Sequence, residues 1–305
     1  MIEKIINVIE YLMILIIFCL FYLIQPVKTN RIIYIPNGSV NYTIKRLQKS
    51  DIDILKIDKY ILFLVGKPQS GWIDLKKTKM TKFDFLYKLT TSKAALKKIT
   101  IIPGETDYFI YKQIAKKMGF NYLKCPKIPK NFIYPDTYYL PYGFKKDEVC
   151  NYLYKVSLKK HKTLSKRIFG YWNFKKYYNF LIIASIIQKE AANKKEMKLI
   201  SSVIYNRLKR KMKLQMDGSL NYGKYSHTKI TPQIIKNNKT KYNTYKYYGL
   251  PSKPVCVVSQ NAIIAAIFPA KTKYLYFIRV NGKHKFAKTY KEHLKYIRKG
   301  KGKTY

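Results

Sequence analysis

Glu190 is the residue of this chain whose type and position best fit catalytic chemistry. It sits in an apolar stretch, 181–191, in a sequence with 61 basic and only 16 acidic residues. If this stretch is helical, Ile183, Ile187 and Glu190 share a face, because residues three and four apart lie on one side of a helix. A carboxyl group held against isoleucines loses hydration, which raises its pKa. Such a group can keep a proton near neutral pH and donate it as a general acid.

The simpler interpretation is that Glu190 marks the solvated end of a core helix, and spacing alone does not exclude it. Two helices are predicted around this residue, at 175–191 and 195–211, because apolar residues recur there at helical spacing. After residue 212 the chain is rich in loops, with short strands expected at 274–280 and 284–287. The loop that follows the second helix could therefore bring polar side chains near Glu190.

Two strand-turn-helix patterns precede this region. The first has a strand and turn at 32–39 and a helix near 41–48, and the second has a strand and turn at 99–106 and a helix at 108–118. Between them, residues 60–66 form a buried strand or helix, and periodicity does not decide which. The pattern predicts an α+β fold: a small α+β module, duplicated in one interpretation, followed by a mainly helical region with short strands.

The N-terminus predicts a membrane anchor. Residues 11–24 contain no charged side chain, and extension back to Ile5 gives about 20 mostly apolar residues, the length that a bilayer span needs. No small-residue cleavage site follows it. We therefore predict three regions: a transmembrane signal anchor at 1–30, the α+β module or modules at 31–125, and a catalytic region at 126–305.

The formal charge of +45 would suit a polyanionic partner. Nearly all of this charge comes from lysines spread along the chain. Proteins that bind nucleic acids usually contact phosphates and bases through arginines at specific positions. We therefore predict no nucleic-acid partner; a lysine-rich cytoplasmic binder of nucleic acid is the competing class. Cys125 and Cys150 could pair outside the cytoplasm and leave Cys256 free, or all three could be thiols. No metal spacing or phosphate-binding loop is present, so no cofactor is predicted.

The chain resembles the endolytic murein transglycosylase family, also called YceG-like or MltG-like. The resemblance spans most of the chain after the anchor and depends on the order and spacing of several short motifs. These motifs lie at 134–138, 184–190, 202–208, 214–217, 221–223, 242–245, 249–251, 265–266, 269–270, 274–277 and 284–286.

The resemblance implies a single-pass inner-membrane enzyme with a cytoplasmic N-terminus, LysM-like modules and a periplasmic catalytic region. Such an enzyme cleaves peptidoglycan strands internally between MurNAc and GlcNAc and leaves 1,6-anhydroMurNAc ends. Peptidoglycan synthases are partners by family analogy. The family usually has two glutamates that flank the lysine of this helix; here the first is Gln188, and Glu190 matches the family's catalytic acid. Gly218 stands where proline is common, which affects the expected loop shape.

One carboxyl group is sufficient for this reaction, although glycoside hydrolysis normally takes two. We expect Glu190 to protonate the bridging oxygen and then to accept the proton of the sugar's own C6 hydroxyl as the anhydro ring closes. If Asp217 acts as a partner base, the enzyme is instead a hydrolase that leaves reducing ends. The glutamine at 188 leaves a further alternative open. If the catalytic region has lost its activity, the protein is a non-catalytic anchor that binds the cell wall.

The expected substrate-binding residues supply flat apolar faces together with amide and hydroxyl groups, which sugars require. Asn206 either contacts substrate or ties its helix to a loop. Asp217 is expected in the polar loop near Glu190. The full set is Asn206, Gln215, Asp217, Tyr242, Asn243, Thr244 and Tyr245.

Overall fold

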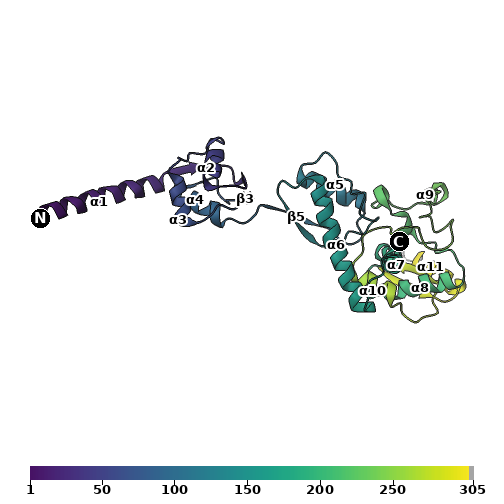
Figure 1. Ribbon diagram of the computed structural model, residues 1–305. Coiled ribbons are helices and arrows are strands. Elements are labelled where there is room, and N and C mark those ends of the chain that lie inside the picture. Colours follow the sequence, from purple (N-terminus) through teal and green to yellow (C-terminus); the bar gives the residue numbers. More distant parts are fainter. Residues whose placement is uncertain (302–305) are drawn as a thin grey trace. The chain divides into compact units, whose positions relative to one another are not determined.

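The computed structural model describes residues 1–301, apart from the side chains of residues 300 and 301. It contains helices and short strands in two compact units (Figure 1). Of the described residues, 1–97 with 139–143 form the N-terminal unit, and 98–138 with 144–301 form the C-terminal unit. The predicted boundary at 125 differs from this division, because residues 98–125 pack with the C-terminal unit; the last four residues of the predicted catalytic region lie outside the described part.

The N-terminal unit begins with α1 (Ile2–Ile24), a helix of 23 residues that projects from the rest of the unit (Figure 1). None of its residues is buried, and the helix is long and apolar enough to cross a membrane. An apolar helix that the protein itself does not cover needs a nonpolar environment. This agrees with the predicted anchor.

The rest of the N-terminal unit is built from two antiparallel strand pairs and three helices. In one pair Val27 lies opposite Met80, and in the other Ile33 lies opposite Ile73, so apolar side chains from all four strands enter one core with α2 and α4. Ser39 and Thr81 cap the helices that follow them by accepting hydrogen bonds from backbone N–H groups. The elements are β1 (Pro26–Lys28), β2 (Ile32–Ile35), α2 (Val40–Gln48), α3 (Asp58–Val65), β3 (Gly71–Asp74), β4 (Lys79–Thr81) and α4 (Lys82–Thr91).

Residues 60–66, predicted as a buried strand or helix, lie mostly in α3. The prediction of burial is wrong for this segment, since Leu62 is buried but Phe63 and Leu64 are exposed. An eight-residue helix can turn only one side to the core, and the continuous apolar run hid which side that is.

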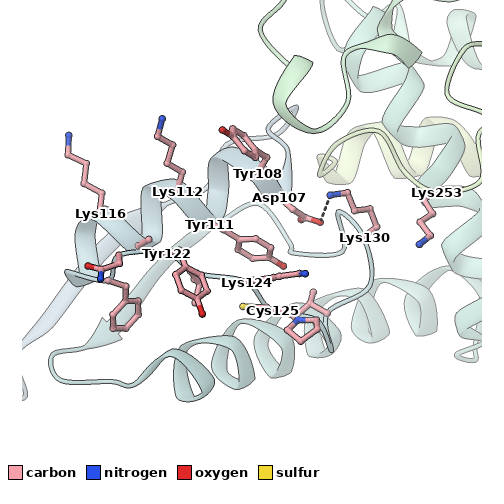
Figure 2. A pocket seen from close by; sticks show the side chains of 16 residues that line it. Asp107, Tyr108, Tyr111, Lys112, Lys116, Tyr122, Lys124, Cys125, Lys130 and Lys253 are labelled. Carbon is pink, nitrogen blue, oxygen red and sulfur yellow. Dashed lines mark ion pairs between the residues drawn. The ribbon is translucent and has the colours of Figure 1, made fainter. Parts of the chain in front are cut away.

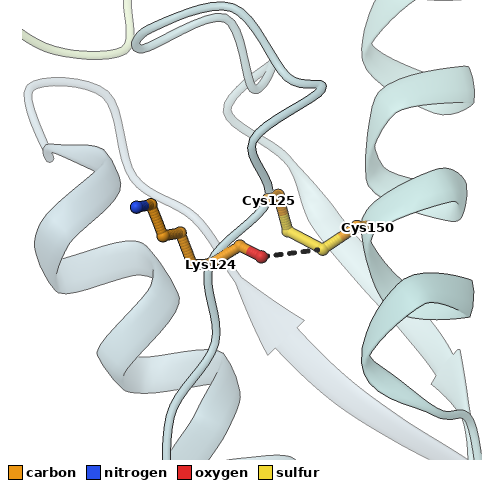
Figure 3. The surroundings of a disulfide bond; sticks show 3 residues. All are labelled: Lys124, Cys125 and Cys150. Atoms are coloured by element: carbon orange, nitrogen blue, oxygen red, sulfur yellow. Dashed lines mark hydrogen bonds between the residues drawn. A yellow bond between two sulfur atoms is a disulfide. The ribbon is translucent and has the colours of Figure 1, made fainter.

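The chain passes from one unit to the other through β5 (Leu96–Thr100) and β6 (Thr137–Pro141), which pair in a two-stranded sheet. Between them lies α5 (Asp107–Met118), and α6 (Lys146–Phe169) follows. A disulfide joins Cys125 in the loop after α5 to Cys150 on α6 (Figure 3). Cys256 is a buried free thiol, so the structure contains the pairing left open by the sequence.

The centre of the C-terminal unit is α7 (Phe174–Glu190), whose residues Leu181 to Ile187 are all buried. It packs against α8 (Met197–Lys209) and α10 (Gln260–Ile267). The predicted helix pair and the two C-terminal strands are present within a few residues of their predicted ends. The remaining elements are the short 3₁₀ helices η1 (Asp217–Leu220) and η2 (Gly223–Tyr225), then α9 (Pro232–Asn237), β7 (Tyr276–Val280), β8 (Lys283–Ala287) and α11 (Tyr290–Lys301).

Candidate active site

Glu190 is the last residue of α7, and a run of buried apolar side chains fixes its position. Asn173 caps the start of the helix by accepting a hydrogen bond from the N–H of Lys176, and the helix ends where Ala191 leaves the helical conformation. The isoleucines that precede Glu190 pack into the core, so the helix end cannot rotate freely. The sequence therefore places one carboxyl group at a rigid point beside the loop that contains Asp217.

The carboxyl group of Glu190 has its pKa raised to about 7. Burial is the main cause, and the negative charge of Asp217 adds to it, whereas a hydrogen bond from the backbone N–H of Gly218 acts against it. This N–H donates to Oε1 over 2.6 Å. Glu190 as a whole is partly exposed, but its carboxyl group is enclosed by protein atoms. A carboxyl group in this state exchanges a proton near neutral pH.

A small cavity of about 160 Å³ lies against Glu190. Three of the predicted substrate-binding residues, Gln215, Asp217 and Tyr245, line it. The hydroxyl of Tyr245 donates a hydrogen bond to Oδ1 of Asp217 over 2.6 Å. The structure thus brings Glu190 together with two polar side chains and one aromatic side chain that could contact a sugar.

Arg207 fixes the shape of this cavity from the side of α8. Its guanidinium donates to the backbone carbonyls of Leu275 over 2.6 Å and of Leu214 over 2.8 Å, and to Oε1 of Gln215 over 3.3 Å. Burial lowers its pKa. Because Gln215 adopts a left-handed backbone with φ of 51°, the loop turns sharply here and returns toward Glu190.

The other predicted substrate-binding residues have their polar groups engaged within the protein. The side-chain amide of Asn206 donates to the carbonyls of Thr272 and Tyr274, and that of Asn243 donates to the carbonyls of Ile235 and Asn238. The Thr244 hydroxyl accepts the N–H of Met216, and both Asn243 and Thr244 are buried.

Tyr242 stacks on Tyr222 with ring centroids 4.3 Å apart and does not line the cavity at Glu190. Together with the bonds of Asn206, Asn243 and Thr244, this stacking holds the loops that shape the site.

Gln188, which the resemblance above places where a glutamate is usual, has a defined partner. Its Oε1 accepts hydrogen bonds from the N–H and the hydroxyl of Ser259, the residue that caps α10. Glu196, at the start of α8, accepts from Nδ1 of His284 over 2.8 Å. Burial raises the pKa of Glu196, but the hydrogen bonds from His284 outweigh it and the net pKa is lowered. Both side chains thus tie separate elements together.

Sequence reasoning missed three groups at this end of α7. The first is the N–H of Gly218, because backbone donors leave no residue signature. The second is Lys189, whose Nζ donates to the Ser226 hydroxyl over 2.8 Å and whose pKa is lowered by burial. The third is Glu105, whose Oε2 lies 3.2 Å from Nε2 of His227. Only the position of Lys189 beside Glu190 could have indicated one of them in advance.

Comparisons with known proteins agree with this architecture. The model of the YceG-like family matches residues 33–299. An endolytic murein transglycosylase of Bacillus subtilis (strain 168) is 37% identical over 143 residues, which cover 47% of this chain and 36% of that protein. Its counterpart in Streptococcus pneumoniae serotype 2 (strain D39 / NCTC 7466) is 37% identical over 120 residues, which cover 37% of this chain and 22% of that protein. Thus these matches span well under two thirds of the length of both curated relatives.

A solved structure has the same fold. The crystal structure of a YceG-like protein from Listeria monocytogenes superposes with a TM-score of 0.54 at 23% sequence identity, and the alignment covers 89% of this chain and 99% of that chain.

Proposed function

The chain belongs to the YceG-like family, and on this premise we propose that it is a membrane-anchored endolytic transglycosylase of peptidoglycan whose general acid and base is Glu190. The observation that best supports this proposal is that the carboxyl group of Glu190, which lies against a cavity, has its pKa raised to about 7 by burial. The curated relatives are named endolytic murein transglycosylases.

The proposed reaction needs one carboxyl group and no water. Protonated Glu190 donates its proton to the oxygen that bridges MurNAc and GlcNAc, and the bond between that oxygen and C1 of MurNAc breaks. The C6 hydroxyl of the same MurNAc attacks C1, and its proton passes to Glu190, which restores the acid. The N–H of Gly218 stabilises the carboxylate between these two transfers, because it points at Oε1.

In this proposal, the remaining residues of the cavity position the glycan strand. Tyr245 offers a ring face, and Gln215 offers an amide, while Asp217 keeps the pKa of Glu190 high through its charge. Asn206, Tyr242, Asn243 and Thr244 act on substrate indirectly, through the loops that they hold.

The N-terminal unit is proposed to hold the enzyme at the membrane and the wall. The order β2-α2-α3-β3, with β2 and β3 paired antiparallel, supports one LysM-like module in residues 31–97. α1 is proposed to span the inner membrane with the N-terminus in the cytoplasm. The Cys125–Cys150 disulfide supports a periplasmic C-terminal unit, since disulfides persist in oxidising compartments. A topology reporter fused after Tyr305 tests this orientation.

Replacement of the proposed acid tests the reaction itself. Glu190→Gln keeps the shape of the side chain but cannot donate a carboxylic proton, so we expect cleavage of purified strands to fall by at least about 10³-fold. Mass spectrometry of the products checks the chemistry, since the proposal requires 1,6-anhydroMurNAc ends. Glu148→Gln, which changes an exposed carboxylate on α6 in the same way, is the control and should retain activity. Cleavage by the Glu190→Gln protein at the wild-type rate would disprove the assignment.

A hydrolase is the second candidate, because Asp217 contacts the same cavity and its charge reaches Glu190. It predicts reducing ends in the same mass spectra. A silent wall-binding anchor predicts no cleavage by the wild-type protein. The three outcomes are distinct in one experiment.

A further inference from the structure

A second cavity of the C-terminal unit, about 900 Å³ in volume, lies beside α5 (Figure 2). Its walls are α5, the loop 120–128 that follows it, and two residues from later segments. Five lysines line it: Lys112, Lys116, Lys124, Lys130 and Lys253. Within the described residues, only Lys130 among them makes an ion pair, with Asp107 over 3.6 Å. Four further lysines therefore lie on the walls and rim of the cavity without a carboxylate partner in the described part of the chain, with the side chains of Lys112 and Lys116 extending outward from α5 (Figure 2), and this charge favours an anionic ligand.

Asp107 provides a second, independent sign of a ligand. The residue lines the cavity and is only 3% exposed. Its Oδ2 accepts the N–H of Asn131 over 2.7 Å, but its Oδ1 is buried and has no hydrogen-bond partner among the described residues. A buried acceptor without a donor is costly, so a ligand that brings an N–H or O–H group would remove the penalty.

The wall opposite α5 is held in place without a ligand. The Cys125–Cys150 disulfide fixes the loop, and Sγ of Cys150 lies 3.7 Å from the carbonyl oxygen of Lys124 (Figure 3). Nζ of Lys146 lies 3.7 Å from the centre of the Tyr122 ring, which lines the cavity. A preformed wall with aromatic and cationic groups is typical of a binding site rather than of a gap between loops.

A hydrogen bond links the start of α5, beside the cavity, to the chain segment that follows Asp217. Thr106, next to Asp107, donates its hydroxyl hydrogen bond to the carbonyl of Gly223, in the segment that follows Asp217. Burial raises the pKa of Tyr242 to about 12, and the charge of Asp107 contributes to this rise. Asn131 donates to the carbonyl of Pro254 over 2.6 Å, beside Lys253. The segment that follows Asp217 is thus hydrogen-bonded to a residue next to the wall of this cavity.

We infer that this cavity binds the peptide stems of peptidoglycan, whose carboxylates meet the lysines and whose backbone N–H groups meet Oδ1 of Asp107. This inference rests on the function proposed above and adds the substrate feature that the enzyme recognises beyond the glycan. Stem peptides fit because they combine free carboxylates with N–H donors, whereas uncharged sugar rings leave the lysines without partners. A protonated phosphate group also satisfies the lysines and can offer an O–H to Asp107, so the test below includes inorganic phosphate.

Binding of a free stem peptide to the full-length Glu190→Gln protein tests the inference without any need for catalysis. The probe is the tetrapeptide released from peptidoglycan by an amidase, and calorimetry measures its affinity. Lys112→Glu with Lys116→Glu should weaken binding at least about tenfold, because two attractive charges become repulsive. Lys117→Glu with Lys127→Glu is the matched control: both residues are exposed in the same segment, and neither lines the cavity. Raised salt should weaken binding to the parent protein and to the control.

Three results would overturn the inference. These are no peptide binding to the Glu190→Gln protein, equal loss in both pairs of variants, or binding of inorganic phosphate but not of peptide. Lys124→Glu, on the opposite wall, is the second variant should the first pair not fold. An enzyme that fails to cleave any glycan would disprove the proposed reaction while the peptide measurement remained valid, so the two failures are distinguishable.

Cleavage kinetics give an independent readout. With peptide-bearing strands, Lys112→Glu with Lys116→Glu should raise KM about tenfold. With strands stripped of peptides by the amidase, KM of this variant and of the wild-type protein should agree. A KM rise on both substrates would contradict a role in peptide recognition.

Discussion

Glu190 and Asp107 are both buried carboxyl groups of the C-terminal unit, but they lie at opposite ends of their helices. Glu190 is the last residue of α7, where unpaired carbonyl groups and the helix dipole disfavour a negative charge. Asp107 is the first residue of α5, where free N–H groups favour one. Burial raises the pKa of both, but only Asp107 is also faced by a lysine.

In the two roles proposed above, this difference lets the same carboxyl chemistry serve two purposes. A carboxyl group with a single N–H donor and an acidic neighbour can hold and release a proton near pH 7. A carboxyl group beside a lysine and the N–H of Asn131 is fixed in place, and it can accept a hydrogen bond from a ligand. The surroundings, and not the carboxyl group itself, separate a proton donor from a binding group.

Among changes that leave Glu190 itself in place, Gly218→Ala should produce the largest effect on cleavage. A methyl group at this position would lie 2.8 Å from Oε1 of Glu190 and 2.7 Å from Cβ of Lys189, so the carboxyl group must move. We expect kcat to fall about 100-fold, because proton transfer depends on the position of the acid. Gly218→Pro adds the loss of the N–H donor, which should raise the pKa of Glu190 further.

The control for this change is Gly170→Ala, where an added methyl group meets no atom within 4 Å. Gly170 has a φ of 78°, so alanine there strains the backbone and tests the general cost of a glycine replacement. A wild-type kcat for the Gly218→Ala protein would mean that the position of the Glu190 carboxyl group does not limit the reaction.

Removal of the disulfide should lower stability, because the bond joins the wall of the Asp107 cavity to α6. We expect Cys125→Ser with Cys150→Ser to reduce the free energy of unfolding by about 3 kcal/mol, as cross-links across loops of this length usually do. Denaturant unfolding measures the change, and the Cys256→Ser protein shows the cost of replacing a buried thiol that forms no disulfide. Equal stability with and without the disulfide would show that packing alone holds this wall.

The buried position of Glu190 could be predicted from sequence, because it depends only on the residues of its own helix. The helix over 175–191 follows from apolar spacing, and its burial raises the pKa of any carboxyl group at that end. The positions of Gln215, Asp217 and Tyr245 at one cavity follow from loop contacts over long sequence separations, so only their motifs indicated them. The Asp107 cavity was not predicted, because its lysines were indistinguishable from the many others in the chain.

The same limit applies to residues whose chemistry suits two purposes. Asn206 and Asn243 have the amides that sugars need, but both amides bind backbone carbonyls of neighbouring loops. Residue type showed that these positions make hydrogen bonds, and only the fold showed with which partner. The exposed side of α3 was missed for a related reason, because an unbroken apolar run has no periodicity.

Glu190 should also lower the free energy of unfolding at alkaline pH, because a buried carboxyl group is unfavourable once it is ionised. Its pKa is raised from 4.5 to about 7, so the folded state binds the proton more tightly than the unfolded state does. Stability from this group is complete below pH 4.5 and is lost as pH rises through about 7. Glu190→Gln lacks this loss, and we expect it to be more stable than the wild-type protein at pH 8 by about 1–3 kcal/mol, with a much smaller difference at pH 4.5. Thermal unfolding at both values measures this; a difference independent of pH would contradict the raised pKa.

The smallest expected effect is a shift of the pH profile in the Asp217→Asn protein. The acid must be protonated, so kcat of the wild-type protein should fall as pH rises above about 7. Removal of the negative charge of Asp217 lowers the pKa of Glu190, so this fall should begin at a lower pH. Asparagine can still accept the hydrogen bond from Tyr245, which keeps the loop in place.

The same variant separates the two candidate reactions. If Glu190 acts alone, the Asp217→Asn protein should retain kcat within about tenfold of wild type at acidic pH, where the lowered pKa of Glu190 matters least. If Asp217 is a base that activates water, its loss should abolish cleavage at every pH, since an asparagine cannot accept that proton. A pH-independent loss of more than about 10³-fold would therefore replace the single-carboxyl mechanism with a hydrolytic one.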